Sequence, residues 1–72
     1  MKPVYFINPP ARCDVCGHDF NKVMYDAITV QGFWACMCQE CFDDIRPGIL
    51  GAGLGQKYIW DDEAHAFKKV EG

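Results

Sequence analysis

Apolar residues gather in short runs along the chain, and each run predicts one element of secondary structure. Residues 4–7 form an apolar run that predicts a strand, and the Asn-Pro-Pro sequence at residues 8–10 ends it because proline cannot donate to a ladder. Residues 21–25 and 33–37 predict the two arms of a β-hairpin. The segment between them, residues 26–32, is expected to hold the turn.

The apolar positions that follow have helical spacing. Phe42 and Ile45 are three residues apart and would share one face of a short helix within residues 38–47. Pro47 and Gly48 are expected to end this helix. The pattern therefore predicts a hairpin followed directly by a short helix.

The pattern in the C-terminal part of the chain allows two structures. Residues 48–55 contain four glycines and predict an extended or looped crossing, and residues 57–60 predict a strand. The acidic residues 61–63 precede apolar positions spaced by three, which locally favours a helix. Equally, residues 66–70 could pair back on residues 58–60 as a hairpin.

Four of the five cysteines form two CxxC pairs, Cys13 with Cys16 and Cys38 with Cys41, with 21 residues between the pairs. Each pair offers two thiolates from one tight turn, and two such turns complete the four-coordinate site that zinc prefers. Gly17 permits the positive φ with which backbone N–H groups turn toward sulfur. We therefore predict one structural Zn²⁺ bound by these four cysteines.

Two other residues, His18 and Cys36, could also take part in metal binding. His18 follows Cys16 by two residues and could replace a cysteine at the metal, but four well-spaced cysteines favour a surface position for it. Cys36 is expected to be a buried residue on a strand, and the alternative is a fifth thiol that exchanges with Cys38. A thioredoxin-like redox pair needs a βαβ scaffold that this chain is too short to build.

The glycine segment and the acidic residues have simpler interpretations than a ligand site. Glycines followed by Lys57 invite comparison with a phosphate cradle, but the Walker pattern is missing, so a backbone crossing close over the zinc or the hairpin is favoured. The acidic residues 43–44 and 61–63 lack EF-hand spacing and are interpreted as solvated charges, as is His65.

Length and cysteine count agree with a metal-stapled protein. The 72 residues are interpreted as a single domain, residues 1–72. A core this small rarely supplies more than about 3–5 kcal/mol, whereas structural zinc supplies roughly 10–16 kcal/mol of apparent binding free energy in small finger peptides. The odd cysteine count, the short N-terminal apolar run and the lack of a membrane-length run favour thiols held by metal in a reducing cytoplasm.

The charge of the chain weighs against nucleic acid as the main partner. The formal net charge is −3, and the seven basic residues are scattered along the sequence. Affinity for nucleic acid comes largely from Lys and Arg that neutralise phosphates. The alternative, a nucleic-acid-binding zinc module, would combine basic residues with aromatic stacking surfaces: Lys22, Arg46, Lys57, Lys68 and Lys69 beside Trp34, Tyr58 or Trp60.

Four stretches carry a resemblance: residues 13–17 (Cys-Asp-Val-Cys-Gly), residues 32–42 (Gly-Phe-Trp-Ala-Cys-Met-Cys-Gln-Glu-Cys-Phe), residues 51–58 (Gly-Ala-Gly-Leu-Gly-Gln-Lys-Tyr) and residues 67–72. They are similar to a group of small, mostly uncharacterised zinc-binding proteins common in bacteriophage genomes. In that group position 36 is commonly polar, and the glycine loop is longer or more regular than here. The resemblance implies that the last segment is a strand.

The predicted fold is therefore a small α+β zinc-stapled domain of treble-clef or zinc-ribbon type. Its order is an N-terminal knuckle, a β-hairpin, a short helix and a C-terminal β-hairpin. The ten aromatic residues exceed what so small a core needs to bury, so some of them are expected to form a contact patch.

The leading hypothesis for function is a non-enzymatic zinc module that binds another protein. The resemblance extends this to a phage-encoded adaptor or inhibitor of a host factor. The nucleic-acid module is the alternative, and a thiol-active protein that uses Cys36 is a third class.

Overall fold

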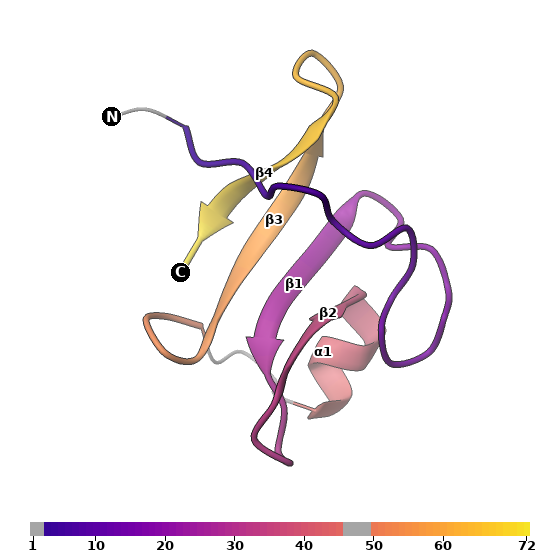
Figure 1. The fold of residues 1–72 in the computed structure, drawn as a ribbon, viewed down its shortest axis with the longest axis vertical. Helices are drawn as coiled ribbons and strands as arrows, with labels where there is room; N and C mark the ends of the chain where they lie inside the picture. The colour runs from indigo at the N-terminus through magenta and orange to yellow at the C-terminus, as the bar shows by residue number, and fades with distance from the viewer. Residues whose placement is uncertain (1–2, 46–49) are drawn as a thin grey trace.

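An antiparallel sheet and one short helix form the described part of the chain, residues 3–45 and 50–72, in the computed structural model (Figure 1). The sheet has four strands in the order β2-β1-β3-β4. This arrangement confirms the predicted α+β class. The elements in chain order are β1 (Val23–Ile28), β2 (Trp34–Met37), α1 (Gln39–Ile45), β3 (Gly55–Asp61) and β4 (Ala66–Glu71).

The predicted first hairpin is present as β1 and β2, with a register that runs from Tyr25 opposite Met37 to Ile28 opposite Trp34. Its first arm lies further along the chain than the predicted residues 21–25, because residues 26–28 continue β1 instead of entering the turn. The prediction is wrong for Asn21 and Lys22, which take positive φ values of +56° and +70° in a turn before the strand. The extension has a physical cause: β1 lies between two neighbours and pairs with β3 as well as with β2. Pairing on both sides keeps these residues extended.

The C-terminal segment is a β-hairpin, as the resemblance implies, and the local indication of a helix is wrong. The Asp61 carboxylate accepts hydrogen bonds from the backbone N–H groups of Glu63 and Ala64, at 3.0 and 3.3 Å. Short acidic side chains favour turns through such local bonds. The acidic residues therefore stabilise the turn between β3 and β4, and the exposed His65 completes it with a φ of +52°.

The N-terminal segment pairs with the outer edge of β4 but forms less strand than predicted. Tyr5 makes one isolated bridge with Lys68. The backbone N–H of Phe6 donates to the carbonyl of Phe67 at 2.9 Å, and that of Lys69 donates to the carbonyl of Val4 at 2.7 Å. These bonds cover the edge of β4, which would otherwise be free to pair with another chain.

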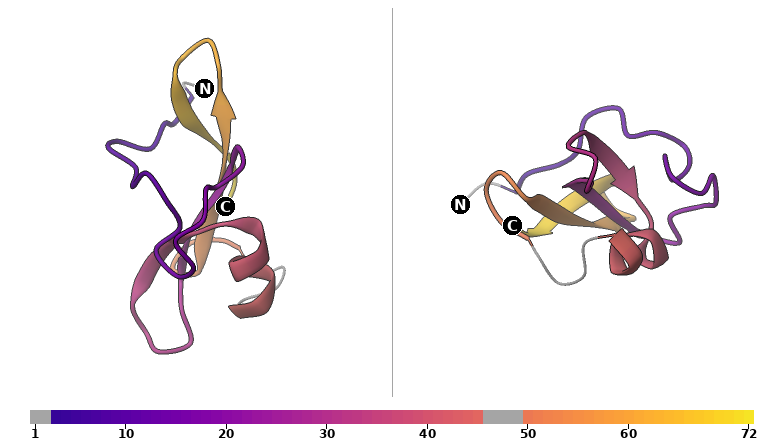
Figure 2. Two further views of the ribbon diagram at one scale, coloured as in Figure 1. Left: turned by 90° about the vertical axis from the view of Figure 1, so that its right-hand side faces the viewer. Right: turned by 90° about the horizontal axis from the view of Figure 1, so that it is seen from below.

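The helix and the N-terminal segment lie on opposite sides of the sheet (Figure 2). On the helix side, Phe42 of α1 stacks on Tyr25 of β1, with ring centroids 4.0 Å apart and planes inclined by 5°. The Tyr25 hydroxyl also donates to Oε1 of Gln39 at 2.7 Å. One tyrosine therefore anchors the helix both through its ring and through its hydroxyl.

Aromatic rings fill the core on the other side of the sheet. Phe6 meets Tyr58 edge to face, with ring centroids 5.3 Å apart. Phe67 makes the same kind of contact with both Phe20 and Trp60. Such pairs stabilise a core beyond the area that they bury. They attach the N-terminal segment, for which ladder pairing is short, to the sheet.

Gly55 is the first residue of β3 and pairs with Ala27 of β1, so the close approach there is a strand pairing and not the predicted crossing of the glycine segment. A Cβ atom on Gly55 would lie 2.6 Å from Cβ of Ala27, which favours glycine at this position, whereas a Cβ on Gly51 or Gly53 would meet nothing within 4 Å. The backbone N–H of Ile28 donates to the carbonyl of Leu54 at 3.0 Å. The amides of Gly51, Leu54 and Gly55 bond to carbonyls within the loop, which disfavours a phosphate cradle built from them. Pro47 and Gly48, the predicted end of the helix, lie outside the described residues.

Asp26 gives the fold a pH dependence. Burial raises the pKa of the Asp26 carboxyl, and the nearby Asp14 carboxylate raises it further. The folded state therefore holds this proton more tightly than the unfolded state does. The contribution of Asp26 to the free energy of unfolding is therefore fully present at pH values below the pKa of this carboxyl in the unfolded state. It is lost as the pH rises through the pKa of the carboxyl in the folded state.

Asp26→Asn should therefore stabilise the protein, and the gain should shrink as the pH falls. Urea unfolding of the metal-loaded protein at about pH 7.5 and about pH 5 measures this effect. Asp44→Asn is the matched control, because it makes the same change at an exposed residue of α1. A gain that stays constant between the two pH values would contradict the proposed cause.

Candidate metal centre

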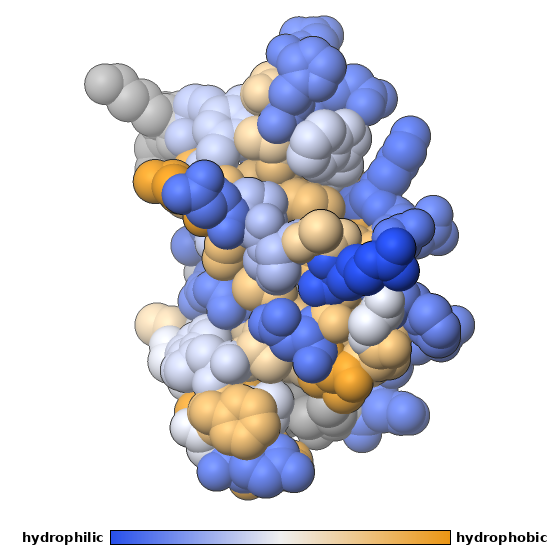
Figure 3. All heavy atoms as spheres, turned by 45° about the vertical axis from the view of Figure 1, so that its right-hand side comes forward, coloured by the Kyte–Doolittle hydropathy of each residue, from blue (hydrophilic) through white to orange (hydrophobic). Residues whose placement is uncertain are grey.

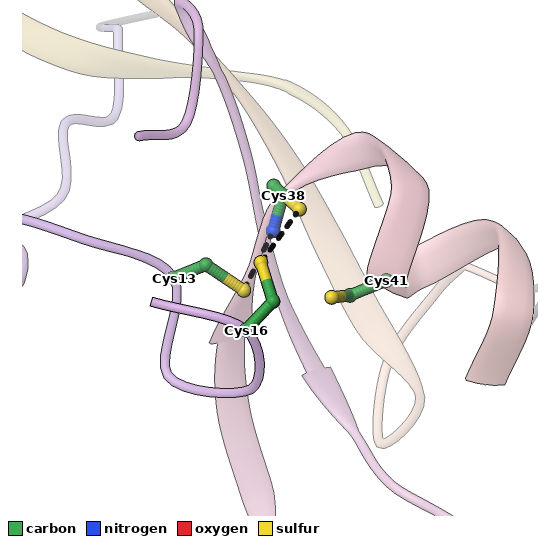
Figure 4. Close-up of side chains that lie close together, drawn as sticks. All are labelled: Cys13, Cys16, Cys38 and Cys41. Carbon is green, nitrogen blue, oxygen red and sulfur yellow. Dashed lines mark hydrogen bonds between the residues drawn. The ribbon is translucent and has the colours of Figure 1, made fainter. Parts of the chain in front are cut away.

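The structure brings together the four cysteines that the CxxC pattern singles out. The sulfur atoms of Cys13, Cys16, Cys38 and Cys41 all lie within 4.8 Å of one another. The sulfur atoms of Cys16 and Cys38 lie 3.7 Å apart. Figure 4 shows the four side chains converging from the N-terminal turn on one side and from α1 and its start on the other.

Local backbone bonds shape the turn that carries the first pair. The N–H of Gly17 donates to the carbonyl of Cys13 at 3.0 Å, and the N–H of Cys13 donates to the carbonyl of His18 at 2.9 Å. Gly17 has a φ of +77°, which glycine adopts without strain. These two bonds close a compact loop that directs both sulfur atoms the same way, as the sequence predicts.

The second pair is fixed by the start of the helix. The carbonyl of Cys38 accepts a hydrogen bond from the N–H of Phe42 at 3.0 Å, so Cys38 occupies the N-cap position of α1. Cys41 follows in the first turn of the helix. Because β2 ends at Met37, directly before Cys38, the hairpin and the helix together set the position of this pair.

The pKa of Cys13 is lowered, whereas the pKa values of Cys38 and Cys41 are raised. Burial raises the pKa of Cys13, but backbone N–H groups of Cys16, Cys38 and Val15 outweigh burial and lower that pKa to about 6. Two of these donors, Val15 and Cys38, lie 3.4 Å from Sγ of Cys13. Such bonds favour the thiolate, which is the form that binds metals.

The pKa values of Cys38 and Cys41 are raised, by burial first and then by neighbouring thiols. Four thiolates gathered this closely repel one another unless a cation lies between them. The donor set therefore fits one metal ion bound by four sulfur atoms, and a divalent cation would remove the repulsion.

Asp14 joins the first cysteine turn to the sheet, and sequence analysis does not identify this role. Its backbone N–H donates to the carbonyl of Cys36 at 2.9 Å. Its carboxylate accepts from the N–H of Cys36, also at 2.9 Å. Both bonds fall on the outer edge of β2, so Asp14 covers that edge and holds the turn in place. No spacing in the sequence links Asp14 to Cys36, because 22 positions separate them.

Asp14→Ala should destabilise the metal-loaded protein by about 1–3 kcal/mol, because it leaves the N–H of Cys36 without its acceptor. Asp14→Asn is the matched control and should retain most of the stability, since its amide oxygen can accept the same bond. Urea unfolding at a fixed free zinc concentration measures both variants. Equal losses of stability in the two variants would show that the hydrogen bond from Cys36 to Asp14 is not the cause of the loss.

Cys36 is buried on β2 and lies outside the cluster of four, as expected for a residue of the sheet. Burial raises its pKa to about 12, and the Asp26 and Asp14 carboxylates add to this effect. A thiol held protonated in this way is a poor nucleophile. His18, the alternative ligand, is exposed and is not part of the cluster.

No protein-family model, curated protein or solved structure matches this chain. Within residues 3–45 and 50–72, no helix has the length and apolar character needed to cross a bilayer.

Proposed function

We propose that Cys13, Cys16, Cys38 and Cys41 bind one Zn²⁺ and that this ion staples the fold. The observation that carries the proposal is the convergence of four sulfur atoms within 4.8 Å of one another. Zinc favours a tetrahedral set of four thiolates in structural sites. The order of a cysteine turn, a hairpin and a helix with two ligands supports a treble-clef-like arrangement.

A site filled by four thiolates keeps no position open for a substrate, so the metal has a structural role, and we propose a non-enzymatic function for the domain. Binding of the ion supplies folding free energy that a core of this size lacks. A reducing cytoplasm preserves the thiolates that this role needs.

The function that we propose for the stapled domain is to bind another protein. The helix α1 packs against β1 and β2, so within residues 3–45 and 50–72 no helix covers the same side of β3 and β4. Ile59 and Val70 are 40 % and 50 % exposed there. They border a hollow of about 360 Å³, and the residues around it are Ile59, Val70, Lys68, Asp61, Asp62 and Glu63, together with Trp60.

This surface combines an apolar centre with an acidic rim, so it fits a partner with an apolar anchor and basic surroundings. The described lysines support nucleic acid less well. Lys68 and Lys69 are neighbours on β4, and successive residues of a strand point to opposite faces. Lys68 and Lys69 therefore do not form a single basic stripe. The resemblance to phage proteins is consistent with a host factor as the partner.

Affinity capture from a nuclease-treated bacterial lysate tests this function. The zinc-loaded protein and its Cys36→Ser variant should enrich the same protein, whereas Cys38→Ser and Ile59→Asp should not. Ile59→Asp places a charge at the centre of the open surface without touching the cysteines. Recovery of nucleic acid without protein, in samples not treated with nuclease, would favour the nucleic-acid module instead.

A further inference from the structure

The turn between β1 and β2 presents three large apolar side chains to solvent. Val30, Phe33 and Trp34 are 69 %, 60 % and 45 % exposed, and we call them the apolar tip. The turn lies at one end of the long axis of the molecule (Figure 1), and Figure 3 shows apolar side chains exposed at that lower end beside polar ones. All three residues lie within five positions at one turn, and exposed apolar side chains gathered at one end of a molecule are typical of an interaction site.

Hydrogen bonds hold the apolar tip in a fixed shape. The backbone N–H and the hydroxyl of Thr29 both donate to the carbonyl of Phe33, each at 2.8 Å. The N–H of Gly32 donates to the carbonyl of Thr29 at 3.0 Å. Thr29 itself is buried, so these bonds are shielded from water. A partner would therefore pay little conformational entropy to order this turn.

The tip is also free of charge, in contrast to the rest of the chain. No Asp, Glu, Lys or Arg occurs in residues 27–39, although such residues make up 24 % of the sequence and give it a net charge of −3. Two copies of an acidic protein repel each other through their charged faces. Contact between two tips places the charged faces of the two copies far apart. A two-fold interface requires a surface that is complementary to itself, and an uncharged apolar patch meets this requirement.

Association through the edges of the sheet is a weaker route to the same assembly. The outer edge of β4 is covered by residues 4–6, and Asp14 bonds to the outer edge of β2 at Cys36. Covered edges offer few free backbone groups for strand pairing. The apolar tip is therefore the better surface for contact between copies.

We propose that the apolar tip binds the tip of a second copy of this chain in a two-fold dimer. The contact is limited by the two shorter extents of the molecule, 27 and 18 Å. The area bounded by these two lengths is smaller than the roughly 800 Å² that each partner buries in a standard interface. The dimer is therefore weak, with a dissociation constant of about 10–100 μM. This inference does not depend on the proposed heterologous partner.

Sedimentation equilibrium of the metal-loaded protein from about 5 to about 500 μM tests the dimer, because this range brackets the expected dissociation constant. The average mass should rise from one chain toward two. Phe33→Ser and Trp34→Ser should each weaken association at least about 10-fold, a change of roughly 1.4 kcal/mol. Val70→Ser, at a similarly exposed residue on β4, is the matched control and should dimerise like the unaltered protein.

Raising the salt concentration should leave the dimer intact, because no charged pair holds it together. A protein that remains monomeric up to about 500 μM would overturn the proposal, and would leave the tip to a different partner. Dimers that persist in both tip variants, or that dissociate in Val70→Ser, would also overturn it. The metal content of each sample is measured in parallel, so failure of the dimer is distinguished from failure of the zinc site.

Discussion

Cys38→Ser should abolish cooperative folding of the protein in the presence of zinc. Cys38 supplies one sulfur atom of the cluster, and serine would keep the backbone bond from Phe42 to residue 38, so the effect falls on the metal site. A serine hydroxyl is a poor ligand for zinc, so the site would keep three thiolates and lose most of its affinity. Since structural zinc contributes roughly 10–16 kcal/mol of apparent free energy in small fingers, this loss exceeds what the core can offset. Circular dichroism and metal analysis of the purified variant measure the outcome.

Cys36→Ser is the matched control for this experiment. Cys36 is two residues from Cys38 and is buried on β2, but it lies outside the cluster. The variant should keep one zinc ion and its fold, at a cost of about 1–2 kcal/mol for burying a hydroxyl. If both variants lost zinc and structure equally, the choice of ligands would be wrong.

Phe42→Ala should destabilise the metal-loaded protein by about 3–5 kcal/mol. Phe42 is 2 % exposed, and its ring stacks on Tyr25 at 4.0 Å. Truncation leaves a cavity between α1 and the sheet, and the neighbouring Cys41 would then sit on a less firmly held helix. The variant should therefore also bind zinc more weakly. Urea unfolding at a fixed free zinc concentration, together with competition against a zinc chelator, measures the two effects.

Phe42→Leu separates the packing effect from a general need for an aromatic ring. Leucine keeps most of the buried volume, so this variant should lose less than half as much stability as Phe42→Ala. A Phe42→Ala protein as stable as the unaltered one would mean that the stack on Tyr25 does not hold the helix.

The parts of the fold that the sequence predicts are those with a local cause. The spacing within each CxxC pair places two sulfur atoms on one turn, whatever the rest of the chain does. Gly17 is needed for a positive φ, and this requirement can be read from residue type. The helix between Gln39 and Ile45 follows from the spacing of its apolar residues.

The features that the sequence does not predict depend on contacts between distant residues. Asp14 meets Cys36 across 22 positions, and Tyr25 meets Gln39 across 14. The acidic residue Asp61 fits a helix start as well as a turn by local criteria, and pairing of β4 with β3 decides between them. Pairing on both sides of β1 likewise extends it to Ile28. These outcomes are tertiary, and local patterns carry little information about them.

Native mass spectrometry, with and without a chelator, shows whether the four clustered cysteines hold a structural metal ion. We expect one zinc ion per chain, with all five cysteines reduced. Chelation should remove the zinc and shift the spectrum to the higher charge states of an unfolded chain. A folded protein that carries no metal, or whose mass shows a disulfide among the four clustered cysteines, would rule out the structural zinc site.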